Sequence, residues 1–108
     1  DARMKEVYHA AYEYQNGHWR AVHEPGVYAP SDTPLLDGDG WHACGNGFTA
    51  YARELIDRHA LQLAEIDTKS YPHAREIATL AAPVFARGDG IAAELAVPHY
   101  VRDRVRVL

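Results

Sequence analysis

The fold of this chain is decided first by residues 6–20, which read EVYHAAYEYQNGHWR. Their first nine positions alternate, so that the even-numbered side chains, mostly tyrosine, share one face of a strand and the odd-numbered ones share the other. Asn16-Gly17 then supplies the two residue types that a type I′ turn requires, because both central positions of that turn need a positive φ. The stretch therefore predicts a β-hairpin with a two-residue loop.

The register of this hairpin follows from the turn. Counting outward from it places Tyr14 opposite Trp19 and Glu13 opposite Arg20. An aromatic pair and an opposite-charge pair each favour that register by up to about 1 kcal/mol.

Periodicity and Gly or Pro boundaries predict the remaining elements. They are a third strand at Gly26–Ala29 between two prolines, a short helix from Ser31 through Leu36, a strand at Trp41–Cys44, an amphipathic helix across 48–56, a looser strand across 61–66, and a long helix from Tyr71 to Arg87. Ser70 is the expected cap of the long helix, Gly88 its expected C′ residue, and Pro83 should kink its last turn.

In this order the elements form an α/β (α+β) fold, with a three-stranded antiparallel meander followed by alternating helices and strands. That is the topology of ribonuclease-H-like domains. A chain of 108 residues fits a single domain with an ordinary core.

Composition narrows the class of protein. The net charge of −4 disfavours independent binding to an RNA backbone, which usually needs a basic surface. The single cysteine, Cys44, excludes an internal disulfide and agrees with a cytoplasmic location; it ends an apolar strand, where we expect it to be buried. No apolar run approaches the ~20 residues that a membrane span needs.

Three short motifs, in order, resemble one known family. Residues 1–8 read DARMKEVY, residues 45–48 read GNGF, and residues 97–102 read VPHYVR. They resemble the second half of the TsaB (YeaZ) family, a Gcp-like, glycoprotease-like group of the tRNA threonylcarbamoyladenosine pathway. Two departures are Lys5, where several relatives carry Gly, and Val101, where the tail motif carries Leu. The resemblance implies a ribonuclease-H-like subdomain of the actin-like ATPase superfamily. It identifies residues 1–108 as the C-terminal half of a two-domain protein whose N-terminal domain is absent.

The resemblance also implies a function. The family's role is a non-catalytic scaffold that supports TsaD together with TsaE, with tRNA reached only through the complex. It implies no cofactor bound by this domain alone, ATP or ADP in the full complex, and a homodimer as one state of the full-length protein. Two alternatives stay open: an active actin-like nucleotide-binding phosphotransferase, and a metallopeptidase as in the older glycoprotease naming.

Four residues are the candidate lining of a degenerate nucleotide cleft. By the resemblance, Asp1 and Arg3 stand where active relatives carry a phosphate-binding turn, and Gly45 and Gly47 stand where a turn borders the adenosine. The alternatives are an interdomain ion pair for Asp1 and Arg3 and an ordinary tight turn for the glycines. We favour these alternatives, because a carboxylate repels phosphate and nothing basic flanks the glycines.

Other reactive side chains form no pattern in the sequence. The seven histidines contain no pair at helical spacing, which predicts scattered surface or satisfied histidines and no zinc site. No nucleophile, base and acid stand in a recognisable arrangement, so no catalytic residue is predicted. Arg102, Arg104 and Arg106 alternate along the tail, as a solvated stripe or a basic edge for a partner.

Overall fold

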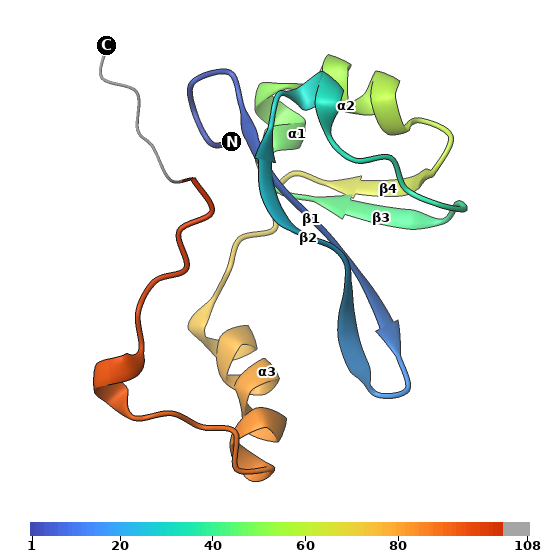
Figure 1. Ribbon diagram of the computed structural model, residues 1–108. Helices are drawn as coiled ribbons and strands as arrows, with labels where there is room; N and C mark the ends of the chain where they lie inside the picture. The colour runs from blue at the N-terminus through green and yellow to red at the C-terminus, as the bar shows by residue number, and fades with distance from the viewer. Residues whose placement is uncertain (103–108) are drawn as a thin grey trace. The chain divides into compact units, whose positions relative to one another are not determined.

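The computed structural model describes residues 1–102, which form two compact units (Figure 1). The first contains Asp1–Ser70 and the segment that begins at Val101, and the second is Tyr71–Tyr100. None of the helices among these residues is long and apolar enough to cross a membrane. The assignment of residues 1–108 to one domain of a two-domain protein stays a prediction.

The predicted hairpin is confirmed. Strands β1 (Val7–Gln15) and β2 (His18–Tyr28) pair antiparallel, with Tyr14 and Glu13 opposite the residues expected from the turn. The rings of Tyr14 and its partner Trp19 lie 5.2 Å apart between centroids in an edge-to-face arrangement. The guanidinium of Arg20 donates to the Glu13 carboxylate at 3.0 Å.

The turn of this hairpin has the predicted left-handed backbone. Asn16 has φ 52° and Gly17 has φ 83°. Asparagine tolerates this conformation better than most residues, and glycine adopts it without steric cost. The two residues therefore form this tight connection between strands without appreciable strain.

We expect Gly17→Ala to lower the free energy of unfolding by about 1 kcal/mol, because a Cβ is disfavoured at positive φ. Nothing else lies within 4 Å of the added carbon, so strain of the backbone is the whole effect. The matched control is Gly17→Asn, which should lose clearly less. Urea unfolding of the three proteins measures the difference, and an equal loss for Ala and Asn would contradict this account of the turn.

The predicted third strand is wrong as a separate element. Strand β2 continues unbroken to Tyr28, so the described residues contain a two-stranded sheet here and no meander. The prediction used Pro25 as a strand boundary, because proline cannot donate to the sheet. The register instead shifts between His9, opposite Gly26, and Ala11, opposite His23. This irregularity accommodates the proline inside the strand.

A second sheet holds the next elements. Strands β3 (Trp41–Cys44) and β4 (Leu63–Asp67) pair in parallel. Between them run α1 (Gly47–Ala50) and α2 (Ala52–His59). The sequence predicted a single helix here. It is interrupted at Tyr51, between α1 and α2, where φ is −130°. Within this unit the two helices lie along one side of the β3–β4 pair (Figure 1).

Two details around these sheets correct the sequence analysis. The predicted helix from Ser31 through Leu36 is only a 3₁₀ turn, η1 (Pro30–Asp32). Cys44 is exposed rather than buried. It stands at the carboxyl end of β3, a strand in which exposed and half-buried side chains alternate, and it lies on the exposed face.

The core of the first unit is small. Among its described residues, four apolar side chains are buried: Ala2, Val7, Ala11 and Leu55. Val7 and Ala11 lie on the odd-numbered face of β1, whereas the tyrosines of the even-numbered face are exposed. The alternation of the sequence therefore does distinguish the two faces, and the face that carries alanine and valine points inward.

The second unit contains α3 (Ala74–Ala86) and a 3₁₀ turn, η2 (Ala93–Leu95). The helix begins later than predicted, and Ser70 does not cap it. The cause is Pro72, which disfavours helical backbone at the residue before it. The C-terminal end is confirmed: Gly88 has φ 84°, and the N–H groups of Gly88 and Asp89 donate to the carbonyls of Phe85 and Val84.

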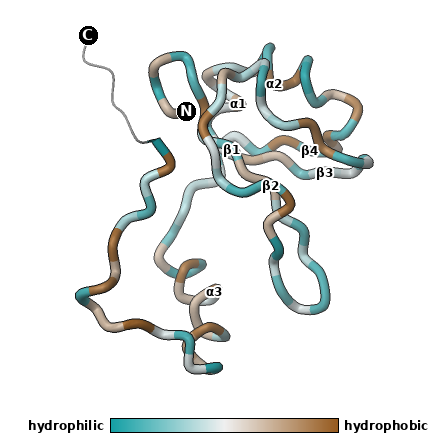
Figure 2. The backbone as a smooth tube through the Cα atoms, in the orientation of Figure 1, coloured by the Kyte–Doolittle hydropathy of each residue, from teal (hydrophilic) through white to brown (hydrophobic). Residues whose placement is uncertain are grey.

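The helix of the second unit buries none of its residues. Figure 2 shows apolar positions along α3 and along the segment that follows it. Ile77, Leu80 and Phe85 are all more than half exposed.

Candidate functional site

The first residues form a turn with an uncommon backbone. Arg3, Met4 and Lys5 have φ 61°, 54° and 61°, three consecutive left-handed positions without a glycine. Each such position costs roughly 1–2 kcal/mol. The turn is closed by two backbone hydrogen bonds of 3.0 Å, from the N–H of Ala2 to the carbonyl of Glu6 and from the N–H of Glu6 to the carbonyl of Arg3. We call residues 2–6 the N-terminal turn.

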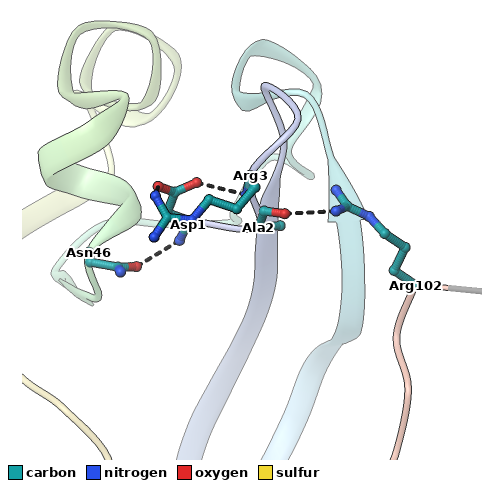
Figure 3. Close-up of polar contacts among 5 residues, drawn as sticks. All are labelled: Asp1, Ala2, Arg3, Asn46 and Arg102. Carbon is teal, nitrogen blue, oxygen red and sulfur yellow. Dashed lines mark hydrogen bonds and ion pairs between the residues drawn. The ribbon is translucent and has the colours of Figure 1, made fainter. Parts of the chain in front are cut away.

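The carboxylate of Asp1 engages one backbone donor of this turn and the Arg3 guanidinium. Asp1 Oδ1 accepts the backbone N–H of Arg3 at 2.8 Å, and Asp1 Oδ2 lies 3.4 Å from the Arg3 guanidinium (Figure 3). The Asp1 side chain is 15% exposed and that of Arg3 is 86% exposed. Asp1 thus brings a negative charge to the turn, and this charge would repel a phosphate bound there.

The glycine turn after β3 lies against the same residues. Asn46 Oδ1 accepts a hydrogen bond from the backbone nitrogen of Asp1 at 2.7 Å (Figure 3). The N–H of Gly45, at φ 115°, donates to the carbonyl of Asp67 on β4. A side chain at Gly47 would place its Cβ 3.3 Å from Val7 Cγ1 and 3.8 Å from the nitrogen of Asp1.

The structure therefore brings together the predicted site residues Asp1, Arg3, Gly45 and Gly47. Asp1 pairs with Arg3 itself, and Gly47 is small because β1 packs closely against it. The ion pair joins Asp1 to Arg3 within one turn, so the interdomain ion pair stays untested, whereas the close packing at Gly47 agrees with an ordinary tight turn. That the four residues line a nucleotide cleft stays a prediction.

Sequence reasoning missed Arg102. Its guanidinium donates through Nη1 to the carbonyl of Ala2 and through Nη2 to the Glu6 carboxylate, each at 2.7 Å. The Arg102 side chain is only 11% exposed, and its Cζ lies 5.8 Å from the centroid of the Tyr8 ring. The solvated stripe predicted for the tail is therefore wrong at this position. Arg104 and Arg106 lie outside the described residues.

The available signal for Arg102 was the tail motif, which ends on this arginine. Alternation along the tail pointed to a solvated side chain, since nothing local offers it a partner. Its partners are Ala2 and Glu6, at the opposite end of the described chain.

A second cluster brings three histidines together from β1, β2 and α2. The ring of His9 lies 5.7 Å from that of His23 and 6.3 Å from that of His59, between centroids. The Nδ1 atoms of all three are buried and have no hydrogen-bond partner among the protein atoms. The prediction of scattered or satisfied histidines is therefore wrong for these three. Pairwise sequence spacing detects neighbours on one helix, and these residues come from three elements.

The hydrogen bonds of Thr33 determine which ring nitrogen of His59 carries the hydrogen. The Thr33 hydroxyl donates to the carbonyl of Pro30 at 3.1 Å and lies 2.7 Å from His59 Nε2. Since its proton is used, the hydroxyl accepts, and Nε2 must carry the hydrogen. The backbone of Thr33 is held in turn by Arg58, which donates from Nε to its carbonyl at 2.7 Å.

Burial lowers the pKa of two histidines of this cluster, His9 and His59. Burial, followed by the nearby His23 and His59, lowers the pKa of His9 from 6.5 to about 4. Burial and then the charge of Arg58 lower the pKa of His59 as well. Both effects disfavour the protonated form. Among residues 1–102 no set of three or more His, Cys, Asp or Glu side chains is arranged to hold a metal ion.

Comparisons with known proteins point to one group of relatives. The chain is 33% identical over 110 residues to the tRNA threonylcarbamoyladenosine biosynthesis protein TsaB of Escherichia coli K12. A solved structure named YeaZ from Pseudomonas aeruginosa has a TM-score of 0.75 at 32% identity over 93% of this chain. Another, an uncharacterized Pseudomonas aeruginosa protein with similarity to peptidase YeaZ, has a TM-score of 0.78 at 31% identity over 94% of this chain. No family model matches.

These similarities cover unequal shares of the proteins compared. The match to TsaB includes 97% of this chain and 46% of the relative. Both solved structures are likewise covered over 46% of their length. The chain thus spans about half the length of the relatives it matches.

Proposed function

Because the chain is related to the TsaB (YeaZ) proteins over almost all of its residues and about half of theirs, we propose that it serves in tRNA threonylcarbamoyladenosine biosynthesis. Its role there is that of a scaffold without catalysis of its own, which supports TsaD together with TsaE. It carries the ribonuclease-H-like subdomain of the actin-like fold and reaches tRNA only through the complex. The net charge of −4 supports this indirect contact.

The observation that carries the scaffold role is the position of the Asp1 carboxylate. In a phosphotransferase this turn would direct free N–H groups and a cation at the nucleotide phosphates. Here one backbone donor and the guanidinium of Arg3 are already engaged by Asp1. A nucleotide would have to displace a carboxylate that repels it. The turn is therefore better suited to a structural role than to phosphoryl transfer.

The test is a reconstituted modification reaction. This chain is added to TsaD, TsaE, tRNA, ATP and an activated threonylcarbamoyl donor, and the modified nucleoside is measured by mass spectrometry after digestion of the tRNA. Escherichia coli TsaB is the positive control. We expect the chain to increase modification in the presence of TsaD and to form no product without it. Product formed by the chain alone would contradict the scaffold role, and so would no increase where the control gives one.

We expect Asp1→Ala to create weak phosphate binding at the N-terminal turn, because it frees the N–H and the guanidinium of Arg3. Inorganic phosphate is titrated into the labelled protein, and the amide signals of residues 2–6 are followed by NMR. The unchanged chain and the control Asp39→Ala, which removes an exposed carboxylate elsewhere, should show no saturable shift. Saturable binding by the unchanged chain would contradict the blocked turn and favour a working nucleotide site.

A further inference from the structure

We propose that Arg102 is a positioning residue that holds the N-terminal turn in its left-handed conformation. The contacts of Arg102 and the conformation of the N-terminal turn are then coupled, so that loss of one loosens the other. The proposal stands on contacts within the first unit and does not depend on the proposed function.

The two hydrogen bonds of Arg102 join the two ends of the turn. Ala2 and Glu6 are the first and last residues of the turn, and the N–H of Ala2 already donates to the carbonyl of Glu6. One nitrogen of the guanidinium binds the carbonyl of Ala2, and the other binds the carboxylate of Glu6. The planar fork therefore spans the base of the turn, which a lysine, with its single charged nitrogen, cannot do in the same way.

The turn needs such a support. Its three central residues, Arg3, Met4 and Lys5, are all in a conformation that L-residues disfavour, and no glycine relieves the strain. Only two backbone hydrogen bonds close it from within. Hydrogen bonds to a charged group are stronger than those between neutral groups, and those of Arg102 are partly shielded from water.

The position of the turn also sets the position of Asp1. The Asp1 carboxylate accepts the N–H of Arg3, and the Asp1 backbone nitrogen donates to Asn46, so a shift of the turn moves this nitrogen away from the glycine turn after β3. Arg102 belongs to the first unit, so its support of the turn acts within that unit.

Limited trypsin digestion of the full chain tests this coupling, with cleavage at each site followed by mass spectrometry. Trypsin cleaves after Arg3 and Lys5, and a closed turn resists it, because the protease binds its substrate in an extended conformation. Arg102→Met keeps the apolar stem and removes the fork. It should accelerate cleavage after Arg3 and Lys5 by at least about tenfold. Arg87→Met, which removes an exposed arginine of the second unit, should leave both sites unchanged.

The reciprocal variant acts from the other side. Glu6→Gln keeps an acceptor oxygen but loses the charge, and it should accelerate cleavage after Arg102, whose side chain is shielded in the unchanged chain. Arg102→Lys should accelerate cleavage after Arg3 less than Arg102→Met does. Cleavage after Arg20, in the hairpin, reports general loss of structure. Equal acceleration at Arg20 in every variant would overturn the proposal, as would unchanged cleavage at Arg3 and Lys5 in Arg102→Met.

Discussion

Lowering the pH from 7 to 5 is expected to reduce the free energy of unfolding through His9 by about 1 kcal/mol, a value that allows for the partial exposure of its ring to water. The folded protein holds the pKa of His9 at about 4, lowered from 6.5, first by burial and then by the neighbouring His23 and His59. Its unfolded chain takes up a proton as the pH falls below about 6.5, whereas the folded protein does not until about pH 4. The stability that the uncharged His9 contributes is therefore present above about pH 6.5, and it is lost progressively as the pH falls from 6.5 to about 4.

His59 should add to this loss, because burial and Arg58 lower its pKa in the same direction. A second proton on His59 would find no hydrogen-bond acceptor among the protein atoms. Its Nε2 already carries the hydrogen that points to Thr33, and its Nδ1, where the second proton would go, is buried without a partner. A charge there would be buried beside two other imidazoles and near the Arg58 guanidinium. The remaining ring packed on His9 is that of Tyr28, edge to face at 6.0 Å between centroids.

Urea unfolding at pH 7 and pH 5 measures the effect. The informative variant is His9→Phe, which keeps a flat ring and removes the titrating group, so it should lose less stability on acidification than the unchanged chain. His18→Phe alters an exposed histidine at the hairpin turn and serves as the control. If the unchanged chain and His9→Phe lose equal stability between the two pH values, the histidine cluster is not the cause.

Leu55→Ala is the second large effect, with an expected loss of about 3 kcal/mol in the free energy of unfolding. Leu55 is 4% exposed and is the largest apolar side chain among the buried residues that the structure describes. Its Cδ1 lies 3.7 Å from where a Cβ on Gly47 would stand, so it packs under the glycine turn. With so few buried apolar side chains, its removal leaves a cavity that the neighbours cannot easily fill.

The chain offers a matched control for this change. Leu61, which follows α2, is 88% exposed. Leu61→Ala removes the same atoms from water-exposed surface and should change stability by less than about 0.5 kcal/mol. Thermal unfolding of both variants with the unchanged chain gives the comparison. Similar losses for the two leucines would show that Leu55 is not the centre of the core.

What the sequence predicted well was local. The hairpin register follows from the geometry of a two-residue turn, and Gly88 ends its helix because the residue after the cap needs positive φ. The boundaries of elements were predicted wrongly where one residue type is compatible with two local structures. Pro25 can end a strand or sit at an irregularity within it, and Ser70 can cap a helix or precede an extended segment.

In the candidate site, by contrast, most of the important contacts join distant segments and were not predicted. The motif resemblance led to Asp1 and Gly47, which do lie close together. The partner of the turn, Arg102, and the gathering of His9 with His59 depend on contacts between distant segments. Such contacts leave no periodic signal in a single sequence, because neither residue constrains the chain next to the other.

The pairing of Arg102 with the N-terminal turn also bears on the order of folding. Its partners stand 100 and 96 residues away along the chain, whereas Glu13 and Arg20 in the hairpin are seven apart. The entropy lost on closing a loop grows with its length, and hairpins form within about 1–10 µs. The contact of Arg102 is therefore expected among the last to form as the chain folds. The N-terminal turn then gains its final conformation only after the rest of the first unit is in place.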